Sequence, residues 1–157
     1  MENLRPHHIV CLSRLYSAIL LFSTDKVLYY NCIRKELEKN GNLREDLLDS
    51  CKVTWGTIYN RKVMDILVKV IKDDVFTISE NLCDSICSAC YGNIDGKCVE
   101  DNRIQIMDTI SINILKLQSK ELTSISKIKH NEEFEKVCQL CGTKQKCNLI
   151  RRAVTKN

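Results

Sequence analysis

The stretch "PHHIVCLSRLYSAILLFS", from Pro6 to Ser23, joins a strong helix pattern to three residues that can bind a metal. Pro6 suits the first position of a helix, where a missing N–H costs nothing. Arg14 interrupts the stretch, no small-residue cleavage site follows, and the segment is too short and too polar to span a bilayer. We therefore predict a buried amphipathic helix in a cytoplasmic protein without a membrane span. Its apolar face, at steps of three and four, is expected to hold Ile9, Val10, Leu12, Leu15, Ile19, Leu20 and Phe22.

The rest of the chain also shows mainly helical periodicity. Ser23 or Thr24 is expected to cap the next helix, and Val75–Ser79 is the one run with strand character. Five glycines and one proline are too few for a turn-rich all-β fold. The prediction is a mostly α, compact single-domain fold over residues 1–157, with two cysteine-rich metal-binding loops, at most a short β element and a tail at 150–157. The further helices are expected at 25–39, 43–51, 58–72, from Asp101 to about 117, and at 131–138.

Composition narrows the classes of partner. Hydrophobic residues make up 44% of the chain and charged residues 28%, which is ordinary for a globular protein. The net charge of +4 is dispersed, and no basic stripe with stacking aromatic residues stands out. This pattern argues against nucleic-acid binding.

Ten cysteines in 157 residues call for a chemical explanation. In a reducing cytosol, paired cysteines more often bind metal or carry out redox chemistry than form disulfides. Two residues between cysteines let both sulfurs turn toward one point. Each of two sets supplies three thiolates and lacks a fourth ligand. The sets are Cys87-x2-Cys90-x7-Cys98 and Cys138-x2-Cys141-x5-Cys147.

A third candidate lies in the first helix. His7 and His8 stand four and three residues before Cys11, so either pair would share a helix face and could present an imidazole and a thiolate to one centre. Alternatively, the histidines only form hydrogen bonds near the helix start while Cys11 packs in the core. Cys11 and the six cysteines of the two sets, together with one histidine, would suffice for two four-ligand sites. Alternatively, four cysteines could hold one site.

The motifs "RPHHIVC", "DSICSAC" followed by Cys98, and "CQLCGTKQKC" together resemble an uncharacterised family of small cysteine-rich bacterial and archaeal proteins. This family is a domain of unknown function for which iron–sulfur binding has been inferred. Tyr91 departs from the family, which commonly has proline there, and Cys32, Cys51 and Cys83 fall outside the pattern, where packing roles are expected. The resemblance picks out Arg5, His7, His8, Cys11, Asp84, Cys87, Cys90, Cys98, Cys138, Cys141 and Cys147.

The resemblance implies an iron–sulfur protein with a [4Fe–4S] cluster. Three ligands would come from the first cysteine set, the fourth would be Cys11 or a cysteine of the second set, and Arg5 would tune the cluster. Such a protein would exchange electrons with a redox partner protein or sense oxidants. It could instead be a small enzyme acting on a sulfur-containing molecule, with His7, His8 and Asp84 as candidate proton carriers.

The alternative from another class is a structural zinc module without catalysis. Zinc accepts four cysteines, or three cysteines and one histidine, and thiolates suit both metals. A radical enzyme that cleaves S-adenosylmethionine would need a longer β/α chain, and a thioredoxin-like oxidoreductase would need a βαβ unit that the sequence lacks.

Overall fold

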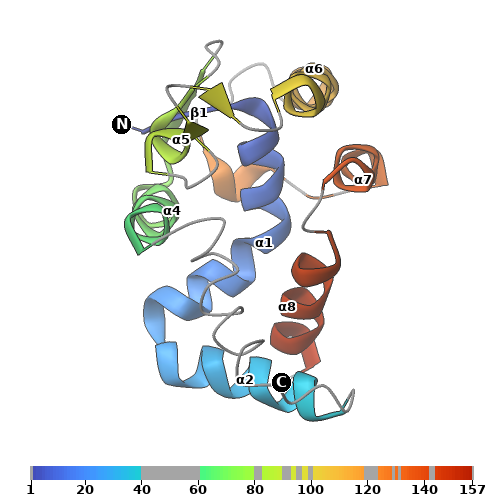
Figure 1. The fold of residues 1–157 in the computed structure, drawn as a ribbon. Coiled ribbons are helices and arrows are strands. Elements are labelled where there is room, and N and C mark those ends of the chain that lie inside the picture. The colour runs from blue at the N-terminus through green and yellow to red at the C-terminus, as the bar shows by residue number, and fades with distance from the viewer. Residues whose placement is uncertain are drawn as a thin grey trace.

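The computed structural model is mostly helical, as the sequence predicts (Figure 1). It describes residues 2–39, 61–79, 83–89, 93–94, 97–98, 101–118, 124–128, 130, 132–141 and 144–156. The helix expected at 43–51 lies outside these ranges, as do Cys51 and Cys90. The described helices are α1 (Pro6–Thr24), α2 (Lys26–Lys39), α4 (Arg61–Asp73), α5 (Ser85–Ala89), α6 (Asp101–Gln118), α7 (Glu132–Gln139) and α8 (Lys144–Lys156), with a 3₁₀ turn η1 at Ile125–Lys127.

Helix α1 is the element around which the others pack. It begins at Pro6, as predicted, and contacts α2, α4, α6, α7, α8 and η1. Figure 1 shows it running through the molecule, with α4 on one side and α6, α7 and α8 on the other. Ile9 and Leu12 are fully buried, but Leu20 is 41% exposed, so its predicted place on the buried face is wrong. Leu20 lies five positions after buried Leu15 in the helix, which turns it about 140° away.

The cap of α2 also differs from the prediction. Asp25 fills that role, because its Oδ1 accepts a hydrogen bond from the Leu28 N–H at 2.9 Å. The hydroxyls of Ser23 and Thr24 instead donate back to the Leu20 carbonyl, at 2.8 and 3.0 Å. Since α1 extends as far as Thr24, both side chains are used by the helix that they end.

The predicted strand is confirmed as β2 (Phe76–Ile78), and its partner is an unpredicted strand, β1 (Glu2–Leu4). The two are parallel, with Leu4 opposite Ile78, and the Ser79 N–H donates to the Leu4 carbonyl at 2.7 Å. This pairing fixes the backbone that leads into α1. A two-residue antiparallel pair, β3 (Asn93–Ile94) with β4 (Lys97–Cys98), follows α5.

The carboxyl-terminal residues are helical, so the expected tail at 150–157 is wrong for residues 150–156. Ile150 and Ala153 lie one helical turn apart and are fully buried where α8 meets α1 and α2. Arg152 Nε donates to Glu36 Oε1 at 3.3 Å. None of the helices in the described ranges is long and apolar enough to cross a membrane.

Candidate functional site

Two groups of chemically active side chains lie against α1. The first, called the thiol cluster here, consists of Cys11, Cys138, Cys141 and Cys147. The second, called the His8 site, consists of His8, Asp84 and Cys87. Helices, rather than the two expected loops, carry many of these residues, because α5, α7 and α8 extend into the cysteine-rich segments.

The thiol cluster draws its cysteines from α1, from the end of α7 and from α8. After Cys138 the chain turns tightly, since the Leu140 and Cys141 N–H groups donate to the Val137 and Cys138 carbonyls at 3.1 and 3.0 Å. Cys147 follows in the first turns of α8. Four thiols thus converge from separate parts of the chain.

The electrostatics of Cys11 place it with the second cysteine set. Burial raises the pKa of Cys11 well above its usual value, and the nearby Cys141, Cys147 and Cys138 raise it further. Thiols that shift one another's pKa in this way would all be stabilised as thiolates by a shared cation. Cys11 therefore lies with the second cysteine set and not with Cys87.

A buried arginine, Arg14, lies beside these thiols. Its Nη1 donates to Cys138 Sγ at 3.5 Å, and its guanidinium also contacts Glu135 and the side-chain oxygen of Asn148. Burial raises the pKa of Cys147 to about 11, while the positive charge of Arg14 opposes that rise. The sequence marked Arg14 only as an interruption of an apolar helix. A charge at a helix position that faces the core is the signal that could have identified it.

One N–H donor of Arg14 makes no hydrogen bond to the described residues. Its Nε atom is buried and has no hydrogen-bond partner among the described residues. A buried donor without a partner costs about 1–3 kcal/mol, so an acceptor bound at this atom would be stabilising.

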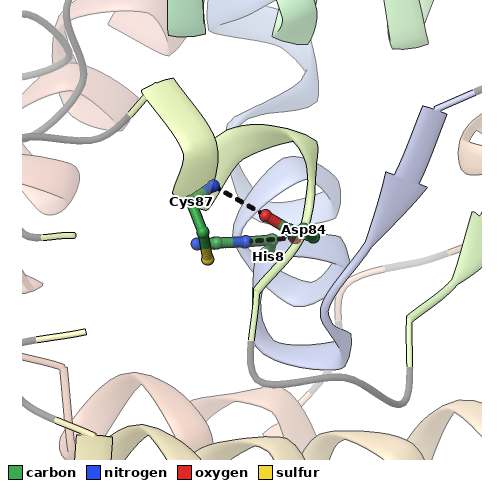
Figure 2. Close-up of side chains that lie close together, drawn as sticks. All are labelled: His8, Asp84 and Cys87. Atoms are coloured by element: carbon green, nitrogen blue, oxygen red, sulfur yellow. Dashed lines mark hydrogen bonds and ion pairs between the residues drawn. The ribbon is translucent and has the colours of Figure 1, made fainter. Parts of the chain in front are cut away.

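In the His8 site, the Asp84 carboxylate joins α5 to the start of α1 (Figure 2). Its Oδ1 caps α5 by accepting the Cys87 N–H at 2.8 Å. Its Oδ2 accepts the Arg5 N–H at 2.5 Å and lies 2.7 Å from His8 Nδ1. Burial alone would raise the pKa of Asp84, but His8 and the two backbone donors outweigh burial and hold this pKa well below its usual range. Asp84 therefore stays ionised and fixes the orientation of the imidazole.

Cys87 lies next to that imidazole. One nitrogen of His8, one oxygen of Asp84 and Cys87 Sγ all lie within 4.8 Å of one another, and the three residues are buried. Figure 2 shows the Cys87 side chain reaching the edge of the ring that is remote from Asp84. Burial raises the pKa of the Cys87 thiol, and the Asp84 charge raises it further, against the influence of Arg5. Without a metal, Cys87 is thus a neutral thiol.

A second carboxylate–imidazole pair stands beside the first. His7 Nδ1 lies 2.6 Å from Asp108 Oδ1, and the His7 and His8 ring centroids are 4.0 Å apart. Fully buried Arg5 binds Asp108 Oδ2 through Nε at 2.8 Å and through Nη2 at 2.6 Å. Burial, together with the neighbouring His8, lowers the pKa of His7 to about 4, so His7 is neutral near pH 7.

Asp108 is a site residue that the sequence reading missed. It lies in α6, three residues before fully buried Ser111 and seven before fully buried Leu115. A carboxylate at the spacing of the buried positions of an amphipathic helix was the available signal.

The structure thus separates residues that the sequence allowed to share one centre. His8 lies with Cys87, Cys11 lies with the second set, and Cys32 is 2% exposed in the hydrophobic core, as predicted. The first set is described in part: Cys90 lies outside the described residues, and Cys98 is placed by its backbone in β4.

Comparison with known proteins gives no match: no family model, no curated protein and no solved structure shows significant similarity to this chain. The family resemblance carried by the three motifs stays a prediction.

Proposed function

We propose that this chain binds a [4Fe–4S] cluster through the thiol cluster and serves in electron transfer or redox sensing. The observation that carries this proposal is the position of Cys11, which supplies a fourth thiol to the C-x2-C-x5-C set. The ligand assignment differs from the sequence expectation, in which the first set held the cluster.

The donor set fits such a group. Four cysteine thiolates are the usual ligands of a [4Fe–4S] cluster. Its sulfides and thiolates would also accept hydrogen bonds, and the buried Arg14 donors face this region, with Nη1 already 3.5 Å from Cys138 Sγ. The unpartnered Nε of Arg14 is in keeping with a further acceptor there.

The spacing of the thiols also favours a cluster over a single zinc ion. Two thiolates on one tetrahedral zinc lie about 3.8 Å apart, given a Zn–S bond of about 2.3 Å. Among the described residues, the set whose ligand atoms all lie within 4.8 Å is His8, Asp84 and Cys87, and no three of the cluster thiols form such a set. In a cluster each cysteine binds a different iron, so the sulfurs stand further apart.

Ligation by four cysteines favours one of the two predicted roles. A fully ligated cluster accepts and releases single electrons, whereas binding a sulfur-containing substrate would need an iron without a protein ligand. The positive charge of Arg14 would stabilise the more negative reduced state and so raise the reduction potential. A reducing cytosol would keep the thiols available, and the counterpart would be a redox partner protein.

The test is anaerobic purification of the full chain, followed by its visible spectrum and by counts of iron, zinc and acid-labile sulfide per chain. We expect a broad band near about 400 nm and about four irons with four sulfides. The Cys11→Ser variant should lose the cluster, and the Cys87→Ser variant should keep it.

Two results would overturn the proposal. Zinc without sulfide in the wild type would replace it with a structural zinc module. A cluster lost from Cys87→Ser but kept in Cys11→Ser would return the ligands to the first cysteine set.

A further inference from the structure

We propose that the His8 site is a second metal site, separate from the thiol cluster, that binds a divalent zinc-like ion through His8 Nε2 and Cys87 Sγ. Asp84 acts there as a positioning residue. This inference does not depend on an iron–sulfur cluster, because none of its residues belongs to the thiol cluster.

The first argument is the way in which His8 is held. Its Nδ1 lies 2.7 Å from an Asp84 oxygen that also accepts the Arg5 N–H at 2.5 Å. An ionised carboxylate in that position accepts a hydrogen bond from the Nδ1–H group, so the proton stays on Nδ1 and the coordinating lone pair of the ring is on Nε2. Histidines that bind metals are typically held in this way by a carboxylate on the other nitrogen.

The second argument is the rigidity of the thiol beside it. The Cys87 N–H is fixed to Asp84 Oδ1 at 2.8 Å, so one carboxylate positions both candidate ligands. Cys87 is 8% exposed, His8 is 6% exposed and Asp84 is 6% exposed, which keeps the group away from competing water. One ring nitrogen of His8, one oxygen of Asp84 and Cys87 Sγ already lie within 4.8 Å of one another, and Figure 2 shows sulfur and imidazole on the same side of α5.

The third argument is the balance of charge. When a metal binds, the Cys87 proton leaves to solvent and a thiolate remains. Together with Asp84 and Asp108 it would place three negative charges around the single positive charge of buried Arg5. A divalent cation neutralises this group. A buried Cys87 thiolate would be costly without that cation, which is why the metal-free site keeps Cys87 as a neutral thiol.

The donor types select the class of ion. Imidazole nitrogen with thiolate sulfur suits zinc and its neighbours, whereas magnesium and calcium require oxygen ligands. Two protein ligands, with the Asp84 carboxylate close by, leave coordination positions for further ligands; a zinc site that activates a bound water has three protein ligands and one such position.

The test uses Co²⁺ as a spectroscopic substitute for zinc, added without oxygen to the full chain after metal removal by a chelator. Wild type is compared with Cys87→Ser, His8→Ala and the control Ser88→Ala. Ser88 is exposed on the same helix, and its hydroxyl donates to the Ser85 carbonyl. To remove the contribution of the thiol cluster, each is also measured with Cys138→Ser and Cys141→Ser, after circular dichroism confirms folding.

In the background that carries Cys138→Ser and Cys141→Ser, we expect one equivalent of Co²⁺ with a thiolate-to-cobalt charge-transfer band, and the same result when Ser88→Ala is added. Cys87→Ser should lose the band, His8→Ala should lose most of the affinity, and Asp84→Asn should weaken binding by about 10–100-fold. A Cys87→Ser variant with unchanged stoichiometry and band would overturn the proposal. A His8→Ala variant with wild-type affinity would also overturn it. Neither of these two outcomes depends on a variant of Asp84, the residue that caps α5.

Discussion

Cys11 and His8 are three residues apart on α1, about 60° around the helix, yet their surroundings differ in kind. Around Cys11 are three further thiols and the guanidinium of Arg14. Around His8 are one thiol and two carboxylate–imidazole pairs held together by Arg5. Adjacent faces of one helix thus meet a soft sulfur environment and a mixed nitrogen, oxygen and sulfur environment.

The difference lies in which element packs on each face. Helices α7 and α8 present cysteines that are close in sequence, while the cap of α5 is Asp84 and α6 presents Asp108. Soft thiolates favour iron–sulfur clusters, and mixed imidazole–thiolate sets favour zinc. If the two proposals hold, α1 keeps an electron-carrying group apart from a Lewis-acid ion although both sit on one scaffold.

The largest effect on metal content should come from two variants that each disable one of the two sites. Cys11→Ser should remove nearly all iron and leave Co²⁺ binding at the His8 site intact, and His8→Ala should do the reverse. Cys32→Ala, a core cysteine that belongs to neither site, should leave both unchanged. The measurements are iron per chain and the cobalt titration. If either single variant lost both metals while remaining folded, the two environments would form one site.

Arg14→Ala should be the most destabilising single change near the thiol cluster. It removes a buried cation from Glu135, Asn148 and Cys138, which would cost about 3 kcal/mol in the free energy of unfolding. Arg14→Lys keeps the charge but not the forked donors, so it should recover part of that loss. Chemical denaturation measures the stability. In the loaded protein, we expect the reduction potential to fall in Arg14→Ala, and an unchanged potential would contradict the role given to its charge.

The His7–Asp108 pair beside the His8 site should affect the pH dependence of the stability of the metal-free protein. The folded pKa of His7 is about 4, below its ordinary value of about 6.5. Between these values the unfolded chain binds the proton and the folded chain does not, so stability is present above about 6.5 and is lost as the pH falls toward 4. The loss should be about 2–3 kcal/mol, and His7→Gln should flatten it. The same slope in His7→Gln would assign the effect to another group.

The sequence predicted the helices well where a periodic apolar face was buried, as in α1, α4 and α6. It could not assign ligands to sites, because spacing along a helix leaves the facing partner open, and only packing shows that His8 meets α5 while Cys11 meets α7 and α8. The parallel partner β1 was missed since a three-residue strand leaves too short a pattern. The α8 end was read as a tail because its charges conceal the two buried positions, Ile150 and Ala153.

The smallest expected effect on metal content is at Asp74, which tests whether a carboxylate with many hydrogen bonds is enough to make a metal site. Asp74 accepts the Ser126 N–H at 2.8 Å and the hydroxyls of Ser124 and Ser126 at 2.7 and 2.6 Å, much as Asp84 does in the His8 site. No histidine or cysteine is bound to it among the described residues, and its backbone is left-handed, with φ of 54°.

Asp74→Ala should therefore cost about 1–2 kcal/mol, through the lost cap of η1 and the strain of a left-handed non-glycine residue. Asp74→Asn, which tolerates that backbone, should cost less.

The hydrogen bonds hold the pKa of Asp74 below its ordinary value although burial alone would raise it. Its contribution is thus present above about pH 4 and fades as the pH falls further, so the gap between wild type and Asp74→Asn should narrow there. Thermal unfolding at several pH values measures this gap. Neither variant should change iron or cobalt content, and a loss of metal in Asp74→Asn would mean that carboxylates outside the two sites also control binding.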